Sequence, residues 1–170
     1  MVACGDADAM VTGGTRHHAA TIEKLNKVVE SRPGEIIFGL TMLVSKGRTV
    51  FVADTNVHDN PTAEQLVEIA ISSTRVARLF GFDPKVAFLS HSTFGKPATV
   101  RTKHVREAIN LMKTKKIDFD YDGEMQPDVA LNPEYKASYP FSKIVGNANI
   151  LIMPALHSAS ITVKLMKTFG

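Results

Sequence analysis

The sequence predicts an α/β fold in which a mostly parallel sheet carries helices on both faces. Short apolar runs alternate with segments in which apolar residues recur every three or four positions, as is typical of parallel sheets with crossover helices. Residues 45–48, Ser-Lys-Gly-Arg, predict a tight turn that adds one antiparallel pair. A chain of 170 residues with 44% hydrophobic and 22% charged residues can bury a sizeable core without a disulfide or metal.

The first elements follow from this pattern. Residues 7–12 predict a short strand. A helix is expected next, ended by residues 32–34, with an apolar face made of Ala19, Ile22, Leu25, Val28 and Val29. Residues 36–44 predict a buried strand, and residues 49–53 predict its hairpin partner.

The clearest helix begins after Thr62. Gln65 lies three residues later, which is the spacing of a capping box. Apolar and small residues then recur at helical spacing as far as Phe80. Gly81 suits the left-handed position that ends a helix, and residues 85–90 predict a buried strand.

The remaining elements complete the alternation. No repeat, low-complexity tract or linker interrupts residues 1–170, which we therefore treat as one domain. The elements are a helix bearing Val105, Ala108, Ile109 and Met112, a strand at 117–121, a short helix at 128–135, a strand at 149–153 and a helix at 158–168. Ligands of such folds bind at the carboxyl ends of the strands, which are followed by loops at residues 12–14, 54–56, 90–95, 122–126 and 154–158.

Composition excludes several classes of function. The formal charge of +3 and the pI near 9.0 come from dispersed residues, so we expect no nucleic-acid partner. The longest apolar run, residues 36–44, is too short to span a bilayer, so we expect no membrane partner. The single Cys4 cannot form an internal disulfide, which suits a reducing cytoplasm.

Two loops contain residues suited to an anion. Thr12, Gly13 and Arg16 lie where a strand should pass into a helix, whose free amides favour negative charge. A purely structural turn is the alternative, because the loop lacks both the dinucleotide fingerprint and the P-loop sequence. Residues 90–96 contain three hydroxyls, a glycine and a lysine, which suit phosphate. A Ser90–His91 nucleophile pair is disfavoured, since neighbours in an extended segment point in opposite directions.

Three acidic residues form a further candidate. Asp120, Asp122 and Glu124 lie at the end of the strand predicted at 117–121, and such clusters can hold Mg²⁺ in a hydrolase. The favoured alternative is a solvated turn with one carboxylate capping the following helix. The histidines and the cysteine show no zinc-binding spacing. From the residues alone we therefore assign no metal site and no catalytic residue.

Several stretches resemble the phosphate acetyl/butyryltransferase family. They keep their order along nearly the whole chain and are FVADTNV at 51–57, PKVAFLSHSTFG at 84–95, DGEMQ at 122–126 and ANILIMP at 148–154. The resemblance implies a three-layer α/β/α sandwich of the isocitrate/isopropylmalate-dehydrogenase-like, phosphotransacetylase type. The family domain is about twice as long as this chain, which implies that residues 1–170 are a partial phosphotransacetylase-like domain.

Other stretches are similar to one branch of that family, the phosphotransacetylase-like domain of bacterial NADP-dependent malic enzymes. They are GDADAMVTGGTR at 5–16, FDYDGEM at 119–125 and MPALHSASI at 153–161. Arg16, His17, Ala20, His157 and Ser160 differ from the residues typical of true acetyltransferases. The similarity implies a regulatory and oligomerisation module within an enzyme that oxidatively decarboxylates malate to pyruvate. The alternative is an acyltransferase that moves an acyl group between CoA and phosphate.

The resemblance also implies ligands and partners. Acetyl-CoA is expected as an effector, NADP and a divalent metal are expected in other domains of the parent, and the assembly is expected to be a homodimer or larger homo-oligomer. Ser90, Ser92, Thr93 and Lys96 are expected to contact the phosphates of CoA, whereas Thr12, Gly13 and Arg16 are expected near the acyl group or a phosphate. Glu124 completes the candidate ligand-binding set. The general base of the acetyltransferases belongs to a segment with no counterpart here, so isolated acetyl transfer is not expected.

Overall fold

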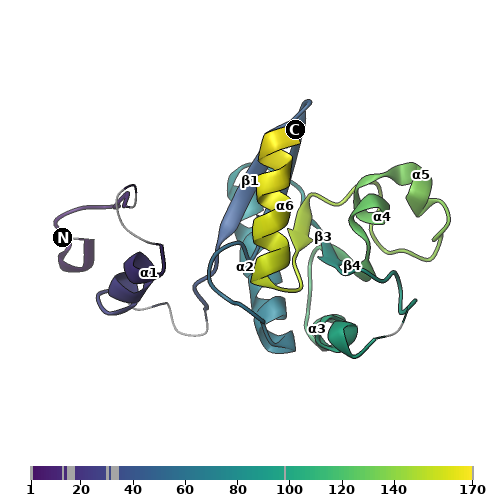
Figure 1. The fold of residues 1–170 in the computed structure, drawn as a ribbon, viewed down its shortest axis with the longest axis horizontal. Coiled ribbons are helices and arrows are strands. Elements are labelled where there is room, and N and C mark those ends of the chain that lie inside the picture. Colours follow the sequence, from purple (N-terminus) through teal and green to yellow (C-terminus); the bar gives the residue numbers. More distant parts are fainter. Residues whose placement is uncertain are drawn as a thin grey trace. The chain divides into compact units, whose positions relative to one another are not determined.

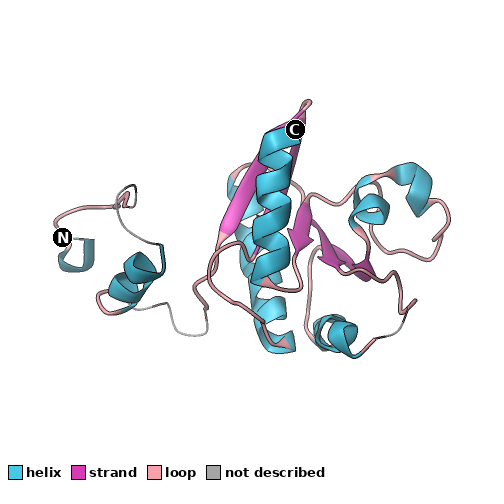
Figure 2. Cartoon of the chain, viewed as in Figure 1, coloured by secondary structure: helices cyan, strands magenta, loops and turns pink. Residues whose placement is uncertain are grey.

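The computed structural model describes residues 2–12, 14, 18–29, 31, 35–97 and 99–169. The chain divides into two compact units, Met1–Ile36 and Ile37–Gly170. Figure 1 follows the chain through both units, and Figure 2 separates helices from strands. No helix in the described ranges has the length and apolar character needed to cross a membrane.

The described part of the first unit contains two short helices. They are the 3-10 helix η1 (Val2–Cys4) and the helix α1 (His18–Asn26). The strand predicted at residues 7–12 is wrong, because no described strand pairs with these residues and an isolated strand cannot satisfy its backbone groups. Helix α1 ends before Val28 and Val29, which lie in the following turn and bend. Gly13 and Arg16 lie outside the described residues, as does the predicted stop at 32–34.

The second unit contains the predicted sheet. Its strand order is β1-β2-β5-β3-β4, and among these described strands only the β1–β2 pair is antiparallel. The strands are β1 (Leu40–Ser45), β2 (Arg48–Ala53), β3 (Lys85–Leu89), β4 (Asp120–Met125) and β5 (Ile150–Ile152). The mostly parallel sheet and its hairpin confirm the predicted fold class. The strand expected at 36–44 begins later and is an edge strand, with Met42 and Val44 exposed.

Six helices accompany the sheet in the described part of this unit. They are α2 (Ala63–Leu79), the 3-10 helix η2 (Val100–Thr102), α3 (Lys103–Thr114), α4 (Pro127–Leu131), α5 (Pro133–Lys136) and α6 (Leu156–Phe169). The capping box of α2 is confirmed, with Thr62 and Gln65 bonding each other's backbone N–H groups. The single helix predicted at 128–135 is two helices, because Asn132 is extended and caps the second one.

The core lies on both faces of the sheet. On one face, Val52, Ala87 and Leu151 pack with Ala159 and Val163 of α6. The alternate strand positions are also buried, including Phe51, Phe88 and Ile150, and they face the side on which α2 contacts β2 and β5 and α3 contacts β3 and β4. Figure 1 shows α6 in front of the sheet and α2 behind it.

The fourth strand differs from its prediction in a way that matters for the site. It spans Asp120–Met125, whereas the sequence placed a strand at 117–121. Gly123 has a φ of +145°, and a Cβ there would lie 2.6 Å from the Phe88 carbonyl oxygen. The glycine therefore allows a polar segment to lie close against β3. As a result, Asp122 and Glu124 lie inside a strand and not in a solvated turn.

Candidate functional site

A cavity of about 800 Å³ opens at the carboxyl ends of β3 and β5. Residues 89–91 at the end of β3 and residues 153–155 at the end of β5 form its floor. The start of α6, the start of α3 and residues 60–61 before α2 form its walls. Because β3 and β5 are adjacent and parallel, their carboxyl ends meet at one edge of the sheet. Of the five loops expected at strand ends, 90–95 and 154–158 contribute to the cavity, as the fold class predicts. The described residues of the loops at 12–14, 54–56 and 122–126 do not line it.

The cavity combines apolar walls with imidazoles and hydroxyls. Its imidazoles belong to His91, His104 and His157, and its hydroxyls include those of Ser90 and Thr102. Among the described residues that line it there is no Asp, Glu, Lys or Arg. Nor do the described residues contain a group of three or more ligating side chains that could hold a metal ion.

One loop beside the cavity is held by a buried aspartate. Asp54 is 2% exposed and follows β2 directly. Its carboxylate accepts hydrogen bonds from the backbone N–H groups of Gly39, Asn56, Val57 and His58 at 2.8–3.1 Å. It also lies 2.7 Å from Nδ1 of His58. These bonds fix the loop that leads to the cavity residues 60–61, and so give Asp54 a structural role.

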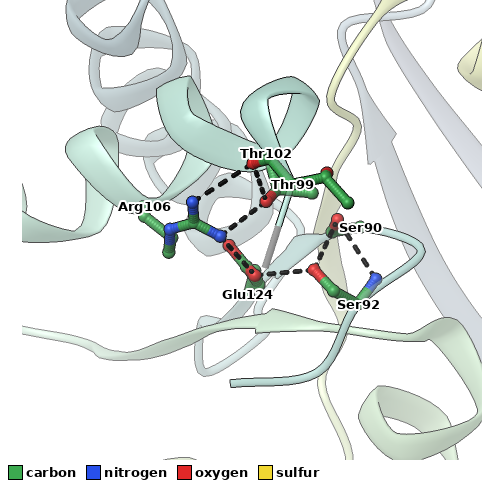
Figure 3. A network of polar contacts seen from close by, with 6 residues as sticks. All are labelled: Ser90, Ser92, Thr99, Thr102, Arg106 and Glu124. Carbon is green, nitrogen blue, oxygen red and sulfur yellow. Dashed lines mark hydrogen bonds and ion pairs between the residues drawn. The ribbon is translucent and has the colours of Figure 1, made fainter. Parts of the chain in front are cut away.

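A polar network lies behind the cavity wall (Figure 3). The Ser92 hydroxyl donates to Oε1 of Glu124 at 2.6 Å, and the Ser90 and Ser92 hydroxyl oxygens are 3.2 Å apart. On the other side of the carboxylate, Nη1 of Arg106 donates to the same Oε1 at 3.2 Å and to Oγ1 of Thr102 at 2.6 Å. The network therefore starts at the Ser90 hydroxyl, passes through an ion pair whose carboxylate is buried, and ends at the Thr102 hydroxyl.

Glu124 is the centre of this network. Its side chain is fully buried, whereas that of Arg106 is 34% exposed. The second carboxylate oxygen, Oε2, is buried and has no hydrogen-bond partner among the described residues. A buried carboxylate is tolerated only when it is paired and hydrogen-bonded. Arg106 and Ser92 therefore stabilise Glu124 in its buried position.

The structure separates the residues that the sequence analysis grouped together. Ser90 lines the cavity, whereas Ser92 and Glu124 are buried behind its wall. Thr93 is 8% exposed, and its hydroxyl accepts from the Gln126 backbone N–H. Only Lys96 of that loop set has an exposed side chain. Thr12 is exposed in the other unit, and Gly13 and Arg16 lie outside the described residues. Ligand contacts at all these positions stay predictions.

Sequence reasoning missed Thr102, His104 and Arg106. They lie at the amino-terminal end of a helix that was recognised only by its apolar face. His104 Nε2 lies 3.0 Å from the Pro154 carbonyl oxygen, which joins the start of α3 to the end of β5. The available signal was the run of polar residues that precedes the apolar face of this helix at a strand-to-helix loop.

A mostly parallel sheet with a cavity at its strand ends, rimmed by helix starts, defines an α/β protein of the class that binds ligands at the carboxyl edge of its sheet. The comparisons identify its family. The profile named "Phosphate acetyl/butaryl transferase" matches residues 1–170. The chain belongs to this family, and the resemblance found in the sequence is confirmed.

Individual relatives are of two kinds. An NADP-dependent malic enzyme of Rhizobium meliloti is 46% identical over 170 residues, which are 100% of this chain and 22% of the relative. A phosphate acetyltransferase of Nitratidesulfovibrio vulgaris is 36% identical over 98% of this chain and 24% of the relative. The crystal structure of a phosphotransacetylase from Streptococcus pyogenes matches with a TM-score of 0.90 and 34% identity, covering 99% of this chain and 53% of the other.

These coverages define what kind of unit the chain is. It spans about half of the solved phosphotransacetylase and less than a quarter of the malic enzyme. It is a phosphotransacetylase-like domain of the type that malic enzymes contain.

Proposed function

We propose that the chain is part of the regulatory domain of an NADP-dependent malic enzyme and that its cavity binds an acyl-CoA, with acetyl-CoA as the effector. The parent would oxidatively decarboxylate malate to pyruvate, and its other domains would bind NADP and a divalent metal. The cavity carries this proposal, because its lining of imidazoles, hydroxyls and apolar groups contains no carboxylate or fixed cation among the described residues. Such a lining suits ligand binding better than acid–base catalysis by a carboxylate.

The malic-enzyme reading has a second support. The Rhizobium meliloti malic enzyme is 46% identical to the chain, compared with 36% for the phosphate acetyltransferase of Nitratidesulfovibrio vulgaris. On sequence grounds alone, we also propose that Arg16 contacts the acyl group or a phosphate and that Lys96 contacts the phosphates of CoA. We also propose a homodimer or larger homo-oligomer and a cytoplasmic location, the latter because the lone free Cys4 suits a reducing compartment.

The test blocks the cavity in the full-length protein. Val100 lines the cavity and is 88% exposed, so Val100→Trp should narrow the cavity without disturbing the core. We expect acetyl-CoA to bind the unaltered protein in calorimetric titrations, to inhibit NADP-dependent malate oxidation, and to lose at least about tenfold in affinity in the variant. Val145→Trp is the matched control, because Val145 is 73% exposed and does not line the cavity.

The alternative function is phosphate acyl transfer. It is favoured by the 0.90 TM-score to the Streptococcus pyogenes phosphotransacetylase. Release of CoA from acetyl-CoA in phosphate buffer, proportional to protein and abolished by Val100→Trp, would replace the regulatory proposal with this one. Tight binding of acetyl-CoA without CoA release would support the regulatory domain.

A further inference from the structure

Three of the hydroxyl groups on the cavity wall, those of Ser90, Thr102 and Ser158, have their protons committed elsewhere. Each serine or threonine hydroxyl has one proton to donate and two lone pairs with which to accept. Where a fixed neighbour takes that proton, only a lone pair is left for a ligand. The direction of the hydrogen bonds behind the wall therefore decides what the wall can recognise.

At Ser90 the direction follows from Glu124. The carboxylate oxygen Oε1 also accepts from Arg106, so the Ser92 hydroxyl donates to it at 2.6 Å. With its only proton used there, Ser92 can only accept from Ser90, 3.2 Å away. The Ser90 oxygen additionally accepts from the Ser92 backbone N–H at 3.3 Å. One lone pair of Ser90, which lines the cavity, is then left for a ligand.

At Thr102 the direction follows from Arg106. A guanidinium can only donate, so Oγ1 of Thr102 accepts from Nη1 of Arg106 at 2.6 Å. The Thr102 proton goes to the Thr99 carbonyl oxygen at 3.0 Å. On the opposite wall, the Ser158 hydroxyl donates to the Ala155 carbonyl oxygen at 2.6 Å. Three hydroxyls from three different segments thus each donate their proton within the protein and keep only acceptor capacity for a ligand.

We propose that Ser90, Thr102 and Ser158 act as acceptors only, so that the part of the cavity wall they form favours a ligand segment that donates hydrogen bonds. This inference rests on the proposed acyl-CoA function and deepens it. The pantetheine arm of an acyl-CoA combines apolar methylenes with two amide N–H donors, which matches apolar walls bearing acceptors. Ionised phosphate oxygens do not donate, so these three hydroxyls do not favour them. The phosphates therefore lie outside this part of the wall, in contrast to the phosphate contact expected of Ser90 from the sequence. Ser92, Glu124 and Arg106 are positioning residues in this arrangement.

The binding experiment compares pantetheine with an analogue whose two amide nitrogens are methylated, using calorimetry on the full-length protein. We expect the analogue to bind at least about tenfold more weakly, as loss of one or two hydrogen bonds implies. Ser90→Ala should reduce that ratio. Ser92→Ala should also reduce it and should strengthen binding of acetyl phosphate, because the Ser90 proton becomes free to donate. Thr168→Val, on the same helix as Ser158 but outside the cavity lining, is the matched control and should leave both affinities unchanged.

A second measurement needs no ligand. Neutron diffraction from deuterated crystals should place the Ser90 deuteron toward Ser92 Oγ and the Thr102 deuteron toward the Thr99 carbonyl oxygen. Deuterons pointing into the cavity, or equal binding of pantetheine and its methylated analogue, would overturn the inference. If the deuterons lie as expected and neither pantetheine nor acetyl-CoA binds, the acceptor polarity stands, whereas the acyl-CoA function and the selectivity for its arm both fail.

Discussion

The buried carboxylate of Glu124 is paired with Arg106. The two residues are 18 positions apart and belong to α3 and β4, and no periodicity in the sequence connects them. From the sequence, Glu124 belonged to an acidic cluster that would either hold Mg²⁺ or lie in water. Neither description fits a carboxylate that is fully buried and paired. Pairing between distant elements is decided by packing, which local patterns do not encode.

Replacing Arg106 should therefore destabilise the fold strongly. In Arg106→Met the Glu124 carboxylate would stay buried without its cation, at a cost of about 3 kcal/mol in the free energy of unfolding, measured in urea. Arg78→Met is the control, because the Arg78–Asp118 pair is exposed and such pairs contribute less than about 1 kcal/mol. The double variant Arg106→Met/Glu124→Leu should recover part of the loss. Equal losses in the two single variants would contradict a special role for the buried pair.

At the scale of elements, the sequence predicted helices better than strands. The amphipathic faces of α2 and α3 and the hairpin between β1 and β2 follow from local patterns. The strand expected at residues 7–12 is not formed, and β4 lies several residues beyond its predicted position. A helix satisfies its own hydrogen bonds, whereas a strand depends on its neighbour. The polar segment of β4 forms a strand because β3 pairs with it.

The cap of α2 should make a measurable contribution to stability. Thr62→Ala removes the side-chain oxygen that accepts from the Gln65 backbone N–H, and we expect a loss of about 1 kcal/mol in urea denaturation. Thr62→Ser keeps the oxygen and should lose far less. The Glu64 backbone N–H and the Thr62 hydroxyl also hold the pKa of the Glu64 carboxyl below its ordinary value of 4.5.

The lowered pKa of Glu64 adds a pH dependence to this prediction. A carboxyl whose pKa falls on folding stabilises the fold above its unfolded value, and that contribution is lost as the pH falls through the folded value. The deficit of Thr62→Ala should therefore be smaller in acid than at neutral pH. A deficit that grows in acid would show that Thr62 acts in some other way.

At the scale of the whole molecule, the order of motifs identified the fold and the family, and the strand-end rule located the cavity. The sequence could not say which side chains would line that cavity. Ser90 does, but its neighbours Ser92 and Thr93 are buried behind the wall. The sequence predicts that neighbouring side chains in an extended segment point in opposite directions. Which of them faces the cavity depends on elements that are distant in the chain.

The surface of α6 bears on how whole molecules associate. Ile161, Leu165 and Phe169 are spaced four residues apart, so they form one stripe along the helix, and they are 58%, 52% and 80% exposed. An exposed apolar stripe of this kind is typical of an interface. In a two-fold dimer the same stripe on each copy can meet its counterpart. The proposed homo-oligomer can therefore be tested on this helix.

We expect the chain to form dimers at tens of micromolar in analytical ultracentrifugation, and Leu165→Glu to weaken them. Burying a leucine side chain contributes about 1.5–3 kcal/mol. Because both chains of the dimer lose Leu165, the dissociation constant of the dimer should rise at least about tenfold. Lys164→Glu is the matched control, because it changes charge at an exposed neighbour off the apolar stripe. Circular dichroism should show unchanged helix content in both variants. A monomeric unaltered chain, or a Leu165→Glu chain that dimerises as tightly as the Lys164→Glu chain, would exclude this stripe as the interface.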